Sequence, residues 1–358
     1  MIFGSMPQGR GGMERIISTL LESNGVAKFS SFYFDFHEGK HIEKDWLLSA
    51  ENVALPTSIL PRFLQEIIVI HKFRQFLIKN NPKIVLCLDE KACKLAYHAR
   101  PSNQIILVSW LHRSLHTFKH QEYFSLMDHH IAISAGIGSD LEKITNQKQN
   151  ISVLPNCVDL VRPFVFNLFP SEKKSFLYVG RIEFEGQKYL KDLFEAFARL
   201  PKSFNLDIIG GGSETEESRC KQACVELGIA DRVIFHGWQK NAWEYLNRSN
   251  INNVSALCLT SCYEGFPLVL IEAIYQGIFC ISSDCPTGPS EILNNKNGFL
   301  FKTHDVDALH DCMLEAAKIK TNPLEIKDSA AKYSKEVYLN QWNLLIDKIV
   351  KNRCDNEE

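Results

Sequence analysis

The sequence predicts an α/β protein built from two doubly wound parallel-sheet domains. Short β-branched or aromatic runs alternate with helical patterns along the whole chain, which is typical of parallel sheets covered by helices. At 358 residues the chain is long for one hydrophobic core, so its length favours two domains. Because ligands of such sheets bind beyond the carboxyl ends of the strands, we expect a site in the cleft between the domains.

The expected elements follow from these patterns. In the first half, the patterns predict strands at 1–4, 31–34, 84–88, 105–110 and 129–133, and helices at 12–23, 60–80 and 135–146. In the second half they predict strands at 175–179, 205–209, 232–235, 256–259 and 279–282, and helices at 189–200, 214–227, 243–248, 268–276 and 308–319. Between them, Pro155 and the stretch from Pro163 to Pro170 indicate a boundary, which places the domains at 1–165 and 166–334.

Composition narrows the possible functions. Lys plus Arg number 40 against 42 Asp plus Glu, and the formal charge of −2 provides no general attraction for nucleic acid. The 11 cysteines include no C-x-x-C pair, which fits reduced thiols in the cytosol rather than disulfides or zinc ligands. The N-terminus lacks a signal-peptide pattern, and no run approaches the roughly 18 apolar residues of a membrane span. We therefore expect a cytoplasmic protein.

The segment from Glu264 to Glu272 is the main candidate site. It is otherwise apolar, and a carboxylate in such a run is costly to desolvate unless something binds it. Pro267 predicts the first helical position, so Glu264 precedes the helix and Glu272 lies within it. The helix start would direct N–H groups at a phosphate beside Phe266 and Leu268, and Glu272 could hold ribose hydroxyls. In the structural alternative, Glu264 pairs with a surface lysine and Glu272 with a core arginine.

Other candidates follow strands in the second half. Arg181 and Lys188 could clamp a diphosphate from two sides, although Arg181 could equally be a salt-bridge partner of Glu183. Gly212 belongs to a glycine turn that lets the backbone approach a ligand closely. The backbone at Trp238 could hold a nucleobase, or Trp238 could pack at a domain interface.

In the first half, Gly12 lies in a loop between a short strand and a helix, where glycines let the loop approach a ligand. With Asp35 ending a strand about 20 residues downstream, this loop could indicate a nicotinamide dinucleotide, but Glu14 occupies the third glycine position. His112 follows the strand at 105–110 and could hydrogen-bond a hydroxyl. A structural role for this histidine is an equal alternative.

Two further features have ordinary structural interpretations. Asp305 and Asp307 look like a metal-binding pair, but a helix follows them and Asp305 is more simply its N-cap, so no metal site is expected. Segment 61–79 combines basic residues with a broad apolar face. It could lie on an anionic membrane surface, or it could cover the sheet with its charges in water.

Together these motifs resemble retaining glycosyltransferases of family 4 with the GT-B fold, which has two Rossmann-like domains facing an interdomain cleft. The resemblance rests on the paired glutamates of 264–272, on Gly180–Arg181 with Lys188, and on the Gly11–Gly12–x–Glu14 loop. Within the family, the passages at 109–112, 132–137 and 282–289 are most similar to bacterial lipopolysaccharide core hexosyltransferases.

The resemblance implies a role for each candidate. Glu272 would bind the nucleotide ribose, and Arg181 and Lys188 would hold the diphosphate. The remaining contacts would come from Glu264 and the backbone of Phe266 and Leu268 to the donor sugar, from Gly12 to the phosphates and from His112 to the sugar hydroxyls. It also implies that a C-terminal helix at 335–358 completes the acceptor-binding domain 1–165, while 166–334 binds the nucleotide sugar.

The implied reaction moves a hexose, in the first instance galactose, from a UDP-sugar to the glucose of the lipopolysaccharide outer core with retention. Arg181, Lys188 and the helix start would stabilise the leaving diphosphate, so no metal or other cofactor is expected. Two alternatives stay open: a family 4 hexosyltransferase of capsule or O-antigen synthesis, and a catalytically silent nucleotide-sugar-binding protein. The expected location includes the cytoplasmic face of the inner membrane.

Overall fold

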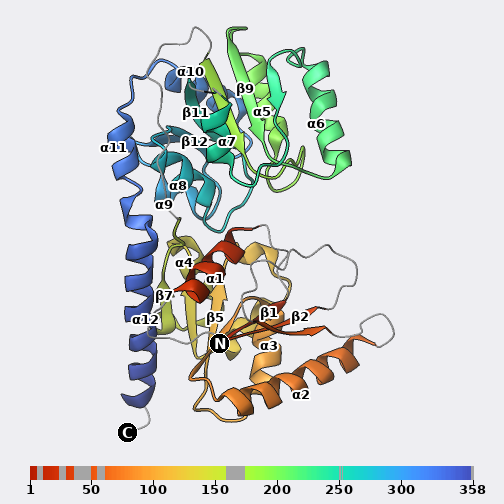
Figure 1. Ribbon diagram of the computed structural model, residues 1–358, viewed down its shortest axis with the longest axis vertical. Helices are drawn as coiled ribbons and strands as arrows, with labels where there is room; N and C mark the ends of the chain where they lie inside the picture. Colours follow the sequence, from red (N-terminus) through yellow and green to blue (C-terminus); the bar gives the residue numbers. More distant parts are fainter. Residues whose placement is uncertain are drawn as a thin grey trace. The chain divides into compact units, whose positions relative to one another are not determined.

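The computed structural model describes residues 1–5, 11–23, 30–35, 50–54, 61–158, 174–249, 251 and 253–355. The chain divides into two compact units, Met1–Cys157 with Lys335–Glu358 as unit 1 and Val158–Ser334 as unit 2. Each unit carries a parallel sheet with its own helices (Figure 1). The predicted class, two doubly wound parallel-sheet domains, is confirmed. The predicted boundary between residues 165 and 166 lies outside the described residues.

Unit 1 contains, in the part of the chain described, a seven-stranded sheet in the order β3-β2-β1-β4-β5-β6-β7. Its strands are β1 (Ile2–Ser5), β2 (Ser31–Asp35), β3 (Ala50–Ala54), β4 (Ile84–Cys87), β5 (Ile106–Leu111), β6 (His129–Ala132) and β7 (Ile151–Val153). Its α-helices are α1 (Gly12–Glu22), α2 (Arg62–Asn80), α3 (Glu90–Ala99), α4 (Ala135–Thr145) and α12 (Lys335–Asp355). Strand order reverses between β1 and β4, which makes this pair the topological switch point.

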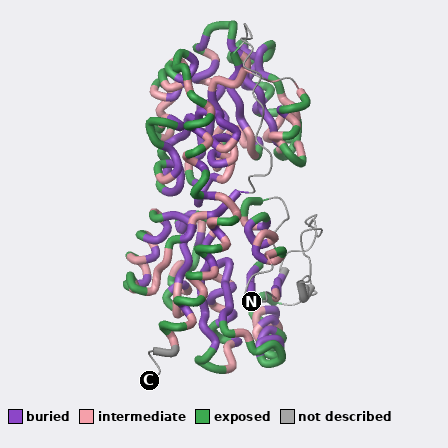
Figure 2. Tube along the Cα trace, turned by 60° about the vertical axis from the view of Figure 1, so that its left-hand side comes forward, coloured by how far each residue is buried: buried purple, intermediate pink, exposed green. Residues whose placement is uncertain are grey.

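Aromatic side chains hold the layers of unit 1 together. The rings of Trp110 on β5 and Trp342 on α12 are 5.0 Å apart, and both side chains are buried. Elsewhere in this core, Phe3 on β1 stacks on Phe73 of α2 with ring centroids 3.7 Å apart. Figure 2 shows the buried segments running through the middle of each unit, with exposed residues outside. The large aromatic area removed from water fixes the C-terminal helix to the unit that begins the chain.

Unit 2 has a six-stranded sheet within its described residues, in the order β10-β9-β8-β11-β12-β13. The strands are β8 (Lys174–Val179), β9 (Phe204–Ile209), β10 (Val233–Phe235), β11 (Val254–Leu259), β12 (Cys280–Ser283) and β13 (Gly298–Phe301). The α-helices are α5 (Leu190–Ala198), α6 (Glu214–Glu226), α7 (Ala242–Arg248), α8 (Leu268–Tyr275), α9 (Pro289–Ile292), α10 (Val306–Ala316) and α11 (Pro323–Asp328). Because the chain continues from β8 and from β11 in opposite directions, right-handed crossovers put α5 and α8 on opposite faces. The switch point is therefore between β8 and β11.

Two helix boundaries can be compared with the expectation. The prediction that Pro267 is the first helical residue is wrong by one position, because Pro267 is the N-cap and α8 begins at Leu268. Asp305 is confirmed as the N-cap of α10, since its carboxylate accepts a hydrogen bond of 2.9 Å from the Ala308 N–H. Every described helix is too short or too polar to cross a membrane.

Three histidines of unit 1 are kept neutral by burial. Burial lowers the pKa of His112 to about 3 and the pKa values of His129 and His130 to about 4. His130 Nδ1 lies 2.7 Å from the Ser109 hydroxyl, and His129 Nε2 lies 3.0 Å from the Ser152 hydroxyl. Neutral imidazole is therefore built into this unit.

This burial makes the stability of unit 1 depend on pH. In the unfolded chain the three histidines titrate near pH 6.5, so unfolding takes up protons once the pH falls below that value. Stability is fully present above about pH 6.5 and falls as the pH is lowered toward 4, by up to about 1.4 kcal/mol per pH unit for each histidine. Denaturant unfolding between pH 7.5 and 5 measures this slope.

Matched variants separate the buried histidines from the rest of the chain. We expect His112→Gln to reduce the slope of the free energy of unfolding against pH below 6.5. The exposed His71 on α2 provides the control, and His71→Gln should leave the slope unchanged. Equal slopes for His112→Gln and the unaltered chain would contradict the proposed linkage.

Candidate functional site

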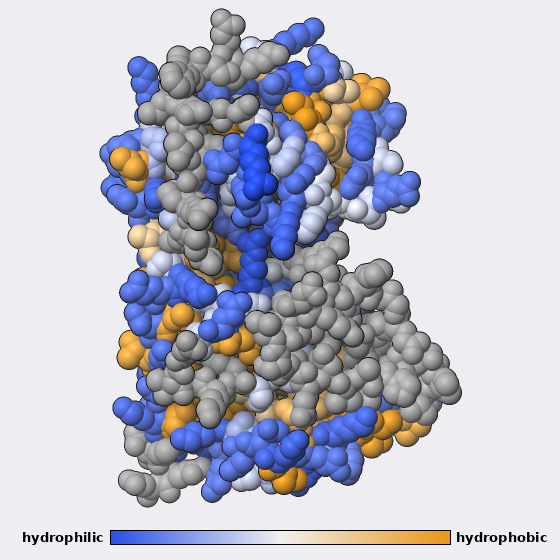
Figure 3. All heavy atoms as spheres, in the orientation of Figure 1, coloured by the Kyte–Doolittle hydropathy of each residue, from blue (hydrophilic) through white to orange (hydrophobic). Residues whose placement is uncertain are grey.

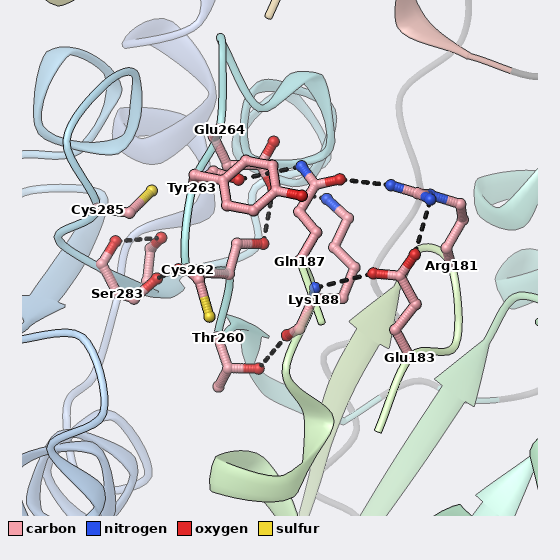
Figure 4. Close-up of polar contacts among 12 residues, drawn as sticks. Arg181, Glu183, Gln187, Lys188, Thr260, Cys262, Tyr263, Glu264, Ser283 and Cys285 are labelled. Atoms are coloured by element: carbon pink, nitrogen blue, oxygen red, sulfur yellow. Dashed lines mark hydrogen bonds and ion pairs between the residues drawn. The ribbon is translucent and has the colours of Figure 1, made fainter. Parts of the chain in front are cut away.

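The site lies where the loops after β8 and β11 meet, at the switch point of unit 2 (Figure 4). The Cys262 N–H donates to the Gln187 carbonyl at 2.8 Å, and the Gln187 side-chain amide donates to the Tyr263 carbonyl at 3.0 Å. The Thr260 hydroxyl donates to the Lys188 carbonyl at 2.9 Å. These three hydrogen bonds fix the two loops against each other, so the side chains they carry have defined positions.

Glycines bring the loop after β9 against the loop after β8. Gly210 has a φ of +155°, and a Cβ there would lie 1.8 Å from the Gly180 carbonyl oxygen. A Cβ on Gly212 would lie 2.3 Å from the Ile182 carbonyl oxygen. Only glycine permits this backbone packing. The Gly212 N–H donates to the Glu217 carboxylate at 3.0 Å, so this amide serves the helix start of α6 in the structure.

Arg181 lies two residues after the end of β8, and its side chain is 62% exposed. Its guanidinium forms an ion pair of 2.7 Å with Glu183 and a hydrogen bond with the Gln187 side chain. The structural alternative, a salt bridge with Glu183, is thus present in the molecule. Because more than half of the side chain remains in water, the guanidinium also remains accessible to an anion.

Lys188 and Glu264 form a nearly buried ion pair. Lys188 Nζ lies 2.6 Å from Glu264 Oε1, and the two side chains are 14% and 8% exposed. The Ser261 hydroxyl donates to the same oxygen at 2.6 Å, and the Thr287 hydroxyl donates to the Glu264 carbonyl. The partner of Glu264 is therefore a lysine, as in the structural alternative, but a lysine of the site rather than of the surface.

Glu272 lies on α8 and has a different environment. Its Oε2 accepts a hydrogen bond of 2.9 Å from the indole N–H of Trp243 on α7. Leu268 opens the same helix, and its neighbour Phe266 is buried with its ring 5.5 Å from that of Tyr333. Any ligand contact of Phe266 would therefore use its backbone.

The other predicted residues take no part in the hydrogen bonds described above. Trp238 follows β10 and is 55% exposed. Gly12 and His112 belong to unit 1, where Gly12 is the exposed first residue of α1. Both ring nitrogens of His112 are buried and have no hydrogen-bond partner in the described part of the chain, and the ring lies 4.3 Å from that of Trp110.

Four residues of the site were not predicted. Gln187 adjoins Lys188, whereas Ser261 and Thr287 are small hydroxyl residues without a recognisable pattern. Trp243 is 29 positions before its partner Glu272, and no local signal connects the two. No group of three or more His, Cys, Asp and Glu arranged to hold a metal ion occurs among the residues that the structure describes.

Comparison with known proteins gives a consistent result. Residues 164–337 match the family model for glycosyl transferases group 1. The chain is 38% identical over 309 residues to the lipopolysaccharide 1,6-galactosyltransferase of Salmonella typhimurium, covering 85% of each protein. It is 36% identical over 306 residues to the enzyme of that name from Escherichia coli K12, covering 85% of this chain and 84% of the relative.

Solved structures agree with the sequence relatives. The apo form of the lipopolysaccharide outer core galactosyltransferase WaaB superposes with a TM-score of 0.86 at 34% identity, over 97% of this chain and 98% of WaaB. Anabaena HepE in complex with UDP and glucose has a TM-score of 0.78 at 17% identity, over 97% and 98% of the two chains, and shares the fold.

Two doubly wound units with charged side chains at a switch point define the GT-B class of glycosyltransferases, as predicted. The chain belongs to the glycosyl transferases group 1 family and is a glycosyltransferase. The nicotinamide dinucleotide interpretation of the Gly12 loop is therefore wrong.

The buried ion pair predicts an asymmetric effect on stability. Lys188→Met leaves the Glu264 carboxylate buried without its cation, and we expect a loss of about 3 kcal/mol in the free energy of unfolding of unit 2. The double variant Lys188→Met/Glu264→Gln should recover most of this loss, because the uncompensated charge is gone. Denaturant unfolding measures both values.

Lys191 provides the matched control. It forms a 3.1 Å ion pair with Glu185, but the side chains are 38% and 41% exposed. Water screens such a pair, so Lys191→Met should change stability little. If Lys188→Met lowered the free energy of unfolding no more than Lys191→Met does, the burial of the Lys188–Glu264 pair would have no effect on stability.

Proposed function

We propose that this enzyme transfers galactose from UDP-galactose to the glucose of the lipopolysaccharide outer core through a 1,6 linkage, with retention at the anomeric carbon. The observation that carries the proposal is the 38% identity, over 85% of the chain, to the lipopolysaccharide 1,6-galactosyltransferase of Salmonella typhimurium. The likeness to WaaB over 97% of the chain supports the same acceptor class.

Unit 2 holds the donor by its diphosphate, ribose and base, the parts that a UDP-sugar shares with other UDP-sugars. Arg181 and Lys188 bind the diphosphate, one as an exposed planar fork and the other as a compact charge from the loop before α5. The first N–H groups of α8, at Leu268 and beyond, add the positive end of the helix dipole. Glu272 accepts hydrogen bonds from the ribose hydroxyls, and the backbone beside Trp238 contacts the base.

Catalysis consists of stabilising the leaving group. As the bond between the sugar C1 and the phosphate oxygen breaks, its electron pair moves to the diphosphate, where Arg181 and Lys188 balance the new charge. Lys188 exchanges Glu264 for the phosphate, which releases Glu264 to a hydroxyl of the donor sugar. These two cations supply the charge for which other transferases use a divalent ion, so the reaction needs no metal.

Retention follows from attack on the same face of the sugar. The acceptor hydroxyl adds to C1, and its proton passes to the departing phosphate oxygen. In this proposal the released Glu264 binds a hydroxyl of the donor sugar and is not a covalent nucleophile, while the Ser261 hydroxyl still donates to its Oε1. His112, neutral and buried in unit 1, suits a hydrogen bond to an outer sugar hydroxyl rather than proton transfer.

Transfer assays test the proposal directly. Purified enzyme, UDP-hexoses and truncated core lipopolysaccharides are combined, and mass spectrometry identifies the product. We expect UDP-galactose to be the preferred donor, a chelator to leave the rate unchanged, and Arg181→Ala or Lys188→Ala to lower kcat roughly 100-fold, as for the loss of one transition-state contact. Lys191→Ala is the control with unchanged rate.

Other outcomes distinguish the alternatives. Transfer only to capsule or O-antigen acceptors would favour a different hexosyltransferase. Binding of UDP-sugars without turnover across the whole acceptor panel would favour a silent nucleotide-sugar-binding protein. Near-normal rates in the Arg181 and Lys188 variants would remove the proposed leaving-group role.

We also propose that α2 rests on the anionic cytoplasmic surface of the inner membrane. One face of the helix packs on the sheet through Phe73 and its neighbours, yet Phe63, Ile67 and Ile78 are 63%, 57% and 62% exposed. At about 100° per residue these three lie within about 60° of one another, so they form a second apolar stripe. Hydrophobic and hydrophilic side chains alternate along this edge of unit 1 in Figure 3.

The charge of α2 determines the expected binding mode. Arg62, Lys72, Arg74 and Lys79 belong to α2, and its single acid, Glu66, pairs with Lys94 at 2.9 Å. An amphipathic helix with an apolar stripe and excess positive charge binds anionic headgroups, and added salt weakens the binding.

Vesicle co-sedimentation checks the membrane proposal. Phosphatidylglycerol vesicles should retain the enzyme at low salt, and the triple variant Arg62→Glu/Lys72→Glu/Lys79→Glu should lose retention. A control variant, Lys119→Glu/Lys351→Glu, reverses exposed charges of unit 1 outside α2 and should bind normally. Retention that ignores both salt and the α2 charges would contradict this role.

A further inference from the structure

We infer that Trp243 positions Glu272 for the ribose, an inference that rests on the proposed function of Glu272. The indole N–H donates to Glu272 Oε2 at 2.9 Å, within the usual range for a hydrogen bond to a carboxylate. Trp243 is on α7 and Glu272 on α8, so the contact joins two helices of unit 2. In this inference Trp243 does not bind the donor itself but acts through the Glu272 carboxylate.

A fixed carboxylate orientation is what binding of a diol requires. The terminal torsion of a glutamate is broad, so an unrestrained carboxylate samples many orientations. A donor at Oε2 restricts this torsion and directs Oε1 away from the indole. Two neighbouring hydroxyls then meet an acceptor whose geometry is set before they arrive, which reduces the entropy lost on binding.

The helix that carries Trp243 is itself anchored to the sheet. Tyr245, two residues further along α7, has its hydroxyl 2.9 Å from His236 Nδ1. His236 Nε2 lies 2.7 Å from the carboxylate of Asp207 on β9, which is buried. With the proton on Nε2, His236 donates to Asp207 and accepts from Tyr245, so every polar atom in this chain of contacts has a partner.

These contacts form one connected path from β9 to the ribose site. Asp207 fixes His236, His236 fixes Tyr245, and the short α7 then carries Trp243 to Glu272. Asn241 caps the start of α7 by accepting the Glu244 N–H at 3.1 Å, which sets where the helix begins. The seven-residue helix α7 is therefore held at its N-terminus by a cap and along its length by Tyr245.

Binding of UDP and of 2′-deoxy-UDP to the full chain tests this inference by calorimetry. The unaltered enzyme should prefer UDP by about tenfold, the effect of one hydrogen bond to a charged acceptor. Trp243→Phe keeps an aromatic ring and removes the donor, so we expect the preference to fall toward unity while the affinity for 2′-deoxy-UDP changes less than about threefold. A Trp243 that only fills space would lower stability without altering this ratio.

Controls separate the inference from the proposed function. Arg248→Ala removes an exposed ion pair with Glu244 on the same helix and should leave the ratio unchanged. In the Glu272→Gln background, adding Trp243→Phe should have no further effect on the ratio. If Glu272→Gln retains the preference for UDP, the ribose role itself is wrong; if Glu272→Gln loses it and Trp243→Phe retains it, positioning by Trp243 is wrong.

A second variant keeps the test decisive should Trp243→Phe fail to fold. Tyr245→Phe removes the hydroxyl that reaches His236 and leaves the indole donor in place. We expect it to lower the ratio by a smaller factor than Trp243→Phe. An unchanged ratio in a folded Tyr245→Phe enzyme would exclude α7 as the positioning element.

Discussion

The ion pair between Lys188 and Glu264 is the interaction on which the candidate site of unit 2 depends. Both charges are nearly out of water, and desolvating them is costly, so the pair contributes less to stability than well-packed apolar residues of the same size would. What the pair provides is a cation and a carboxylate in fixed places at the ends of β8 and β11. In the proposed mechanism, a phosphate that approaches the lysine competes with Glu264, and this exchange would couple donor binding to the hydrogen bonding of the carboxylate.

The two glutamates of the site illustrate how surroundings assign different roles to one chemical group. Glu264 stands before α8, buried, with a cation and the Ser261 hydroxyl on one oxygen. Glu272 lies within the helix, half-buried, with a neutral indole donor on one oxygen. The first carboxylate can change partners when charge arrives. On the second carboxylate, the indole N–H is a neutral donor, which fits the proposed role of Glu272 as an acceptor for ribose hydroxyls.

The sequence predicted those strands and helices that have a clear local pattern of apolar residues. The strands β4, β5 and β8 are short, mostly apolar runs rich in β-branched or aromatic residues, so their positions follow from the sequence. Helix α3 was missed because its buried positions include small residues such as Ala92, Cys93 and Ala96, which give a weak periodic signal. The short edge strands β7 and β13 were also missed, since three or four residues rarely stand out from a loop.

The site could be predicted as a set of residue types but not as a set of partners. Lys188 and Glu264 are 76 positions apart, and only the crossing of the sheet at its switch point brings them together. The sequence left two partners open for Glu264, a surface lysine or a ligand. In the structure its partner is Lys188, the lysine that the sequence analysis expected to bind the diphosphate. The anchoring of Glu272 by Trp243 depends on the placement of α7, which no local pattern records.

Both sheets have a switch point, and the two points differ in the charged side chains that lie there. In unit 1, between β1 and β4, Asp89 accepts the backbone N–H groups of Ser5 at 3.0 Å and Ala92 at 2.8 Å, so a carboxylate closes this end of the sheet. In unit 2, the equivalent place presents Lys188 and Arg181. In the proposed mechanism, a diphosphate that gains negative charge as it leaves is matched by the cations of the second arrangement, whereas the first presents a carboxylate. The doubly wound topology therefore supplies two equivalent places, and in the proposed mechanism the charge at each determines which one holds the diphosphate.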